Sequence, residues 1–143
     1  MEHFSLKLED TERIASELAQ DLRPGDIVLL KGNLGAGKTT MTKAIAKALG
    51  VTEEVTSPTF GLMHVYPAQN NQDITQVIHI DTYRLESEED LIDIAAEDYV
   101  GQNRNVSIIE WPEKISNFLA GKQTKMVEIE LQDGNTRKIT IQK

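Results

Sequence analysis

The sequence contains no cysteine, and this absence excludes several kinds of chemistry. The chain cannot form a disulfide, bind zinc or an iron–sulfur cluster through thiolates, or use a thiol nucleophile. It also lacks long apolar runs: residues 27–30 are far shorter than the ~20 residues of a membrane span. The N-terminus has neither the basic nor the apolar segment of a secretory signal. We therefore expect a cytoplasmic protein that does not bind a membrane.

Positive charge is scarce as well. The 143 residues include 15 Lys and Arg against 23 Asp and Glu, a net charge of −8 at pH 7. That sign opposes binding of a phosphate backbone over a broad face, so a nucleic-acid role would require a basic partner. Because domains usually contain about 100–200 residues, residues 1–143 are expected to form a single domain.

Hydrophobic periodicity predicts an α/β fold. Phe4, Leu6 and Leu8 alternate with polar residues as in a half-buried strand, and a helix with Asp10 and Thr11 at its start follows until residues 24–25. The apolar run at 26–31 is typical of a central parallel strand covered on both faces. Further helices are predicted at 38–49, 86–99 and 114–119, and further strands at 59–66, 77–81 and 106–110. Residues 126–131 and 136–141 predict a hairpin around Asp133-Gly134.

Residues 32–39 read Gly-Asn-Leu-Gly-Ala-Gly-Lys-Thr and match the phosphate-loop pattern G-x-x-x-x-G-K-[ST]. Backbone N–H groups of such a loop surround phosphate oxygens, and the following helix adds its positive N-terminus. Lys38, expected at a solvent-facing loop end, would bridge the β- and γ-phosphates, and the Thr39 hydroxyl would bind Mg²⁺. No [NT]-K-x-D tetrapeptide is present, which removes support for guanine specificity. The expected ligands are ATP or ADP and Mg²⁺, and the expected contacts are Asn33, Leu34, Gly35, Ala36, Gly37, Lys38, Thr39 and Thr40.

Two carboxylates stand at the ends of predicted strands, Asp81 after residues 77–80 and Glu110 after residues 106–109. Either suits the metal-side acid of a phosphate-loop protein, because ligands of such sheets bind at the C-terminal strand ends. The alternative for each is an acidic cap or turn residue. His79 shares a strand face with Asp81 and would orient it or serve as a buried structural histidine. Trp111 would form a wall of the site or belong to the core.

Four motifs together resemble those of the bacterial TsaE family. They are the loop from Gly32 to Thr40, Ser57-Pro58-Thr59-Phe60, His79-Ile80-Asp81-Thr82-Tyr83-Arg84 and Glu110-Trp111-Pro112-Glu113. Their order and spacing match throughout, and the likeness covers nearly the whole chain. The fold that follows is a P-loop NTPase-like three-layer sandwich, with a mostly parallel central sheet and an antiparallel C-terminal hairpin.

The resemblance implies an ATPase that works with the TsaB and TsaD proteins. Together they form threonylcarbamoyladenosine (t6A) at position 37 of tRNAs reading codons that begin with A. The family member does not itself transfer the threonylcarbamoyl group, and it would meet tRNA only through the complex. The chain alone is expected to hydrolyse ATP only weakly, and its activity is expected to depend on these partners.

The resemblance also implies roles for individual residues. Thr39 and Glu110 would be the magnesium ligands, Lys38 the phosphate-binding lysine, and Asp81 either a catalytic acid or an acid that supports the metal site without binding the ion directly. A switch loop would include Ser57 and Thr59. The remaining residues implied are Tyr83, Arg84 and Trp111 as switch or partner contacts, and Thr11 and Gly134 as contacts of the adenine.

Two other functions remain open from the residues themselves. A small P-loop kinase acting on a metabolite would need a lid with arginines and a second substrate pocket. Arg84 and Arg104 are the only arginines between Arg23 and Arg137, so such a lid is poorly provided for. A nucleotide-binding scaffold without useful hydrolysis is the third possibility.

Overall fold

A computed structural model gives the structure and describes residues 1–33, 35–56 and 63–142. The strands of the described chain form one seven-stranded sheet in the order β1-β7-β6-β2-β5-β4-β3. Their bounds are β1 (Glu2–Ser5), β2 (Ile27–Lys31), β3 (Met63–Pro67), β4 (Gln76–Asp81), β5 (Asn105–Glu110), β6 (Lys125–Leu131) and β7 (Arg137–Gln142). The helices are α1 (Leu8–Asp21), α2 (Lys38–Ala48), α3 (Glu89–Asp93) and α4 (Ser116–Leu119), with 3₁₀ turns η1 (Ala96–Asp98) and η2 (Pro112–Ile115).

The sheet is mixed, with the parallel strands at its centre, as expected. Strands β6, β2, β5 and β4 run parallel to one another, whereas β7 and β1 at one edge and β3 at the other are antiparallel to their neighbours. The antiparallel β6–β7 pair is the predicted C-terminal hairpin. The parallel block carries the phosphate-loop motif, because β2 leads directly into the loop that precedes α2.

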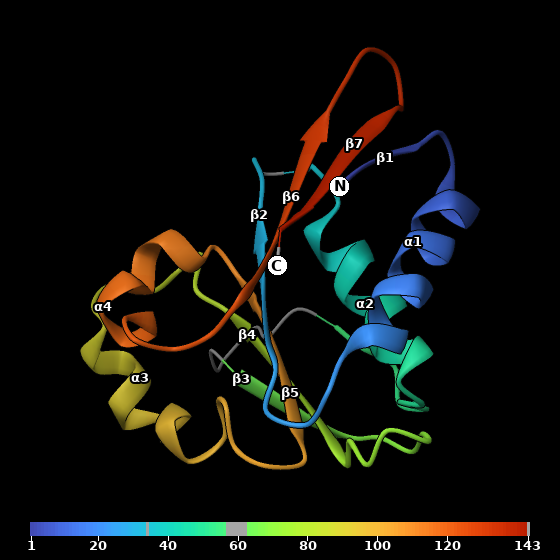
Figure 1. Ribbon diagram of the computed structural model, residues 1–143. Coiled ribbons are helices and arrows are strands. Elements are labelled where there is room, and N and C mark those ends of the chain that lie inside the picture. Colours follow the sequence, from blue (N-terminus) through green and yellow to red (C-terminus); the bar gives the residue numbers. More distant parts are fainter. Residues whose placement is uncertain (34, 57–62, 143) are drawn as a thin grey trace.

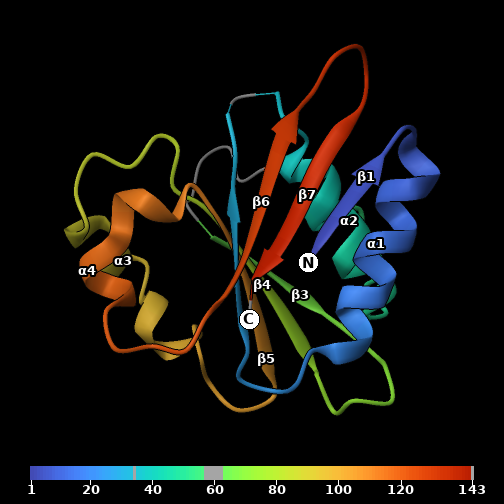
Figure 2. The same cartoon turned by 45° about the horizontal axis from the view of Figure 1, so that its top comes forward.

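Helices cover both faces of the sheet (Figures 1 and 2). On one face, α1 and α2 bury Ile14, Met41 and Ile45 with β2 and β5 residues in one apolar cluster. On the other face, α3 and α4 lie over β2, β5 and β4, where Leu91 and Ile115 belong to a second apolar cluster. Four of the five residues of β2 are buried, as expected for a strand covered on both faces. No helix within the described residues is long and apolar enough to cross a membrane.

The N-terminal prediction was wrong in its boundary and in its buried face. Phe4, Leu6 and Leu8 are 55%, 67% and 55% exposed, and Leu8 already begins α1. The strand stops at Ser5, because the carboxylate of Asp10 accepts a hydrogen bond from the Leu6 N–H and organises the helix start. Ser5, not the apolar residues, faces inward, and its hydroxyl bonds that of Thr11 at 2.6 Å.

Two other predicted elements differ in extent. The expected helix over 86–99 is divided into α3 and η1 by Ala95, whose φ of 57° lies in the left-handed region. The expected strand over 59–66 corresponds to β3, which begins at Met63, and residues 59–62 lie outside the described part of the chain.

Candidate functional site

The loop between β2 and α2 depends on two glycines with positive φ and on a hydrogen bond from the C-terminal hairpin. Gly35 and Gly37 have φ of 83° and 109°, a conformation that other residues rarely adopt. A Cβ on Gly37 would lie 3.0 Å from Nε of Arg137, and that Nε donates a hydrogen bond to the Ala36 carbonyl at 2.8 Å. Arg137, at the start of β7, therefore supports the loop from the C-terminal hairpin. Leu34 lies outside the described residues.

Lys38 is the first residue of α2 and is only 5% exposed, which corrects the expectation that it faces solvent. Its ammonium donates hydrogen bonds to the carbonyls of Gly32 at 2.6 Å and Asn33 at 2.9 Å, and lies 4.0 Å from the centre of the Trp111 ring. Burial lowers the pKa of Lys38, while the negative charges of Glu110, Asp81 and Glu113 act in the opposite direction. Lys38 is thus folded back onto the loop that it would use to hold phosphate.

Glu110, the last residue of β5, is only 2% exposed, and three side chains lie within hydrogen-bonding distance of its carboxylate. The Thr39 hydroxyl donates to its Oε1 at 3.2 Å. Its Oε2 lies 2.6 Å from Nε2 of His79 and 3.3 Å from the Thr42 hydroxyl. This corrects the idea that His79 orients Asp81, because its ring nitrogen contacts the other carboxylate, that of Glu110.

Asp81, the last residue of β4, lies beside Glu110 in the sheet register. Its Oδ1 accepts a hydrogen bond from the Tyr83 N–H at 3.0 Å. Partial burial raises the pKa of Asp81, and the neighbouring Glu110 charge adds to this effect; the Tyr83 hydrogen bond, His79 and Lys38 oppose it. Asp81 is therefore more easily protonated than an ordinary aspartate.

Aromatic rings connect this region to the surface. The Trp111 ring lies 5.1 Å from that of Tyr83, measured between centroids, and Tyr83 is 45% exposed. Lys114 donates a hydrogen bond to the Tyr83 carbonyl. Arg84, the next residue, is also exposed. A chain of contacts thus runs from Lys38 through Trp111 and Tyr83 to solvent.

One pocket of about 340 Å³ contains most of the predicted chemistry. It is lined by Gly35, Gly37, Lys38, Thr39, Thr40, Asp81, Tyr83, Glu110, Trp111 and Arg137. It opens at the C-terminal ends of β2, β5 and β4, where ligands of parallel sheets bind. The loop glycines, Lys38 and both carboxylates therefore line one cavity.

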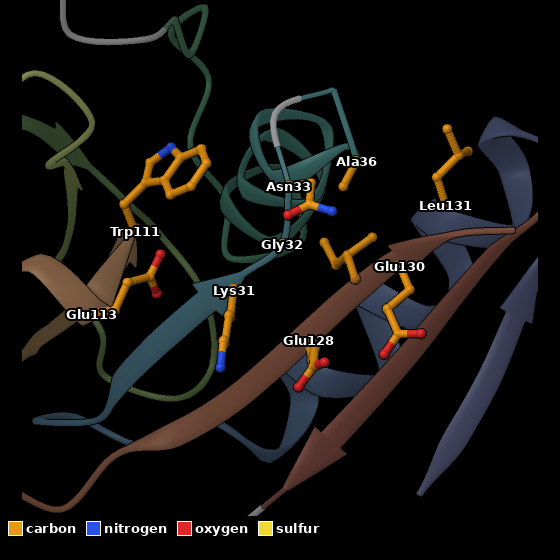
Figure 3. Close-up of a pocket in the computed structure, with 10 residues that line it drawn as sticks. Lys31, Gly32, Asn33, Ala36, Trp111, Glu113, Glu128, Glu130 and Leu131 are labelled. Atoms are coloured by element: carbon orange, nitrogen blue, oxygen red, sulfur yellow. The ribbon is translucent and has the colours of Figure 1, made fainter.

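A second hollow, of about 640 Å³, is also lined by Trp111 (Figure 3). Gly32, Asn33 and Ala36 of the loop line it, and its other lining residues come from β2, β6 and the segment after β5. These include Lys31, Glu113, Glu128 and Glu130. Lys38, Thr39, Asp81 and Glu110 do not line it, so we place the candidate chemistry in the smaller pocket.

Some predicted residues lie elsewhere. Thr11 is buried in the first turns of α1, and Gly134 lies in the exposed loop of the β6–β7 hairpin; neither lines the smaller pocket. A groove of about 590 Å³ between α1 and α2 does connect Leu8, near Thr11, with Thr40 at the loop. Ser57 and Thr59 are outside the described residues.

With this geometry in view, comparison with known proteins gives a consistent result. A family model described as "Threonylcarbamoyl adenosine biosynthesis protein TsaE" matches residues 5–139. The chain belongs to the TsaE family. A relative from Treponema pallidum, named tRNA threonylcarbamoyladenosine biosynthesis protein TsaE, is 38% identical over 99% of both chains. The Bacillus subtilis protein of the same name is 36% identical over 92% of this chain and 78% of its own.

A solved structure supports the same relationship. The crystal structure of Bacillus subtilis YdiB has a TM-score of 0.77 to this chain at 28% sequence identity, and the match covers 99% of this chain and 83% of YdiB. This chain and YdiB therefore share the same α/β architecture.

Sequence reasoning missed Arg137 and Thr42; of its two interpretations of His79, the buried position is confirmed, whereas the contact with Asp81 is replaced by one with Glu110. Arg137 is about a hundred residues from the loop it supports, so no local pattern reveals it. Thr42 lies one helical turn after Lys38, and this spacing could have placed its hydroxyl on the same side of α2. The His79 contact depends on the register of β4 against β5, which the strand patterns alone do not give.

Proposed function

We propose that this TsaE-family chain binds ATP with Mg²⁺ and hydrolyses ATP weakly. Its nucleotide state would then act on the TsaB and TsaD proteins during t6A formation at position 37 of tRNAs reading codons that begin with A. The observation that carries the proposal is the shared pocket, in which Lys38 and Thr39 of the loop meet Asp81 and Glu110 from two strand ends. In this role the chain does not transfer the threonylcarbamoyl group itself.

The residues present suit a magnesium nucleotide. Mg²⁺ prefers oxygen ligands and usually keeps several waters, so one hydroxyl and one carboxylate are an appropriate protein contribution. The Thr39 hydroxyl and Glu110 Oε1, 3.2 Å apart, offer this pair. When bound, the ion neutralises charge on the phosphate oxygens. Asp81, on the adjacent strand, would orient the attacking water, and its raised pKa supports a role in accepting a proton.

Lys38 must change partners in this function. Its ammonium, now on the carbonyls of Gly32 and Asn33, would leave them for the phosphate oxygens. The same movement would withdraw its charge from the Trp111 ring. Trp111 contacts Tyr83 at the surface, so a movement of the lysine would change contacts that a partner protein can detect. Arg84 is our preferred partner contact there.

The loop after β2, the helix that follows it and the parallel strands around it support a P-loop NTPase-like fold. The groove between α1 and α2 begins at Thr40 and supports placing adenine near the start of α1. Thr11 and Gly134 remain its proposed neighbours. The Thr11 hydroxyl already bonds Ser5, so its helical turn, rather than this hydroxyl, would border the base.

The kinase alternative gains little from the arrangement. Arg104 immediately precedes β5, at the opposite end of the strand from Glu110, so it is poorly placed for a lid over the pocket. Among the arginines of the described residues, Arg137 alone lines the pocket, and its Nε already donates a hydrogen bond to the Ala36 carbonyl.

Phosphate release from ATP, measured with the chain alone, with TsaB and TsaD, and with both partners plus tRNA, tests the proposal. We expect slow release alone and faster release with the partners. The matched control is Lys38→Ala, which should lose the stimulated release. Release that needs a small-molecule acceptor would favour the kinase, and ATP binding without release under any condition would favour the scaffold.

A further inference from the structure

The carboxylate of Glu110 needs something to hold it, because it is buried and no Lys or Arg forms an ion pair with it among the described residues. Three side chains approach its two oxygens, and they divide between them. Thr39 meets Oε1, on the side of the phosphate loop. His79 and Thr42 meet Oε2, on the side of the sheet and α2.

The contacts of Oε2 are unequal. Thr42 has a single hydroxyl hydrogen, and its oxygen lies 3.0 Å from the Lys38 carbonyl but 3.3 Å from Oε2. A hydroxyl one turn along a helix commonly donates to that carbonyl. His79 is closer, at 2.6 Å, and is fully buried. A carboxylate only accepts hydrogen bonds, so Nε2 of His79 must carry the hydrogen. His79 is therefore the principal donor to Oε2.

We propose that His79 is a positioning residue that anchors Oε2 of Glu110 and thereby directs Oε1 toward Thr39, where the magnesium ion of the proposed function would bind. The inference rests on that proposed function. Its geometry is independent of it, since the 2.6 Å contact and the burial of both side chains are properties of the chain itself. Groups that hold a metal ligand in place commonly change metal affinity 10- to 100-fold when removed.

The surroundings of His79 show that its ring makes one side-chain hydrogen bond among the described residues, the one to Glu110. It projects from β4 on the sheet face that α2 covers, together with Ile108, its partner in the register of β5. Its Nδ1 is buried, and no partner for it is found among the described residues. The ring is thus held on one side by the carboxylate and by packing elsewhere. An amide of the right length could replace this single donor.

Two conservative variants separate hydrogen bonding from packing. In His79→Gln the side-chain amide reaches the position of Nε2, whereas in His79→Asn it reaches only the position of Nδ1 and cannot contact Oε2. Ile108→Ala is the matched control, because it removes buried volume beside His79 without touching the carboxylate. Circular dichroism on each variant establishes that it folds.

The readout is ADP binding by isothermal titration, first in EDTA and then across a magnesium series. We expect His79→Asn to raise the Mg²⁺ concentration for half-maximal tightening about tenfold or more, with ADP affinity in EDTA within about twofold of wild type. His79→Gln should recover most of the shift, and Ile108→Ala should show none.

The possible failures are distinguishable. If His79→Asn weakens ADP binding equally with and without Mg²⁺, or if His79→Gln is no better, the histidine is only structural and the inference is wrong. If the wild-type chain binds no ADP, or binds it identically in EDTA and Mg²⁺, the proposed function fails and the inference fails with it. A magnesium effect in the wild type that His79→Asn leaves intact defeats the inference alone.

Discussion

Replacing Lys38 with alanine tests the phosphate loop and the folded-back lysine together. In the wild type, the ammonium donates two hydrogen bonds to loop carbonyls and faces the Trp111 ring. Hydrogen bonds from a charged donor contribute about 1.5–3 kcal/mol each, and the ring contact about 1 kcal/mol. Lys38→Ala loses these contacts but also removes the cost of burying a charge, which is several kcal/mol. The lowered pKa of Lys38 has the same cause.

Because these contributions oppose each other, the free energy of unfolding should change by no more than about 2 kcal/mol in either direction. For a chain of this size each kcal/mol shifts the melting temperature by about 2–4 °C. The affinity for ATP should change more clearly. One charge-assisted contact to phosphate is worth about 1.5–3 kcal/mol, or roughly 10- to 150-fold in affinity. The lower end is expected, since wild-type Lys38 must first leave Gly32 and Asn33.

Isothermal titration with Mg-ATP and thermal melting by circular dichroism measure the two effects on the same samples. Lys31→Ala is the control, because Lys31 is exposed at the end of β2 and its loss changes the net charge equally without altering the pocket. Unchanged ATP affinity and hydrolysis in Lys38→Ala would refute the phosphate-loop assignment. A large loss of stability would show that the lysine is chiefly a structural link.

Four further outcomes are expected. Glu110→Gln should raise the Mg²⁺ requirement of ATPase activity about tenfold, whereas Asp81→Asn should chiefly slow hydrolysis with metal binding retained. Magnesium titrations of ATPase activity on both variants measure this. A reversed result would mean that the two carboxylates have exchanged roles. Asp81→Asn should also raise the melting temperature at pH 7, because a raised folded-state pKa means that the ionised form opposes folding above that pKa. Melts of variant and wild type should converge as the pH falls toward 4, and a difference that grows on acidification would contradict the cause given. Gly37→Ala should lower stability by about 1–2 kcal/mol, since its φ is 109° and its Cβ would press on Arg137; a denaturant titration that shows no loss would argue against the loop conformation. Pull-downs with TsaB and TsaD should depend on whether ATP, ADP or no nucleotide is present and should weaken in Arg84→Ala, while the chain alone should bind tRNA weakly at physiological salt; equal capture in all three conditions would defeat the switch.

Local patterns predicted the centre of the fold well. The apolar run of β2, the glycines of the loop and the helical spacing of α2 each depend on neighbours within a few residues. The β6–β7 hairpin has the same character, since Asp133-Gly134 marks its turn. Elements of this kind are recognisable because propensity, periodicity and turn chemistry agree over one short segment.

Contacts between distant segments could not be predicted in this way. The alternation of Phe4, Leu6 and Leu8 follows the strand rule, yet β1 pairs with β7 at the sheet edge and leaves these side chains exposed. Period-two reasoning placed His79 on the correct strand face, but its partner, Glu110, belongs to another strand. Which carboxylate it meets depends on the β4–β5 register. The candidate site was predictable as a set of residue types, and its internal connections were not.

The charges around Lys38 bear on how such a site can control a partner. Glu110, Asp81 and Glu113 all act on this one lysine, and the proposed nucleotide would add several negative charges to the same pocket. Phosphate and carboxylates would repel each other without a cation, so nucleotide binding and metal binding are expected to be strongly linked. In the proposed function, loss of the terminal phosphate would then change both the local charge and the best position for the ammonium. Since that ammonium contacts Trp111, and Trp111 contacts exposed Tyr83, hydrolysis would alter a surface that a partner can recognise without any large movement of the sheet.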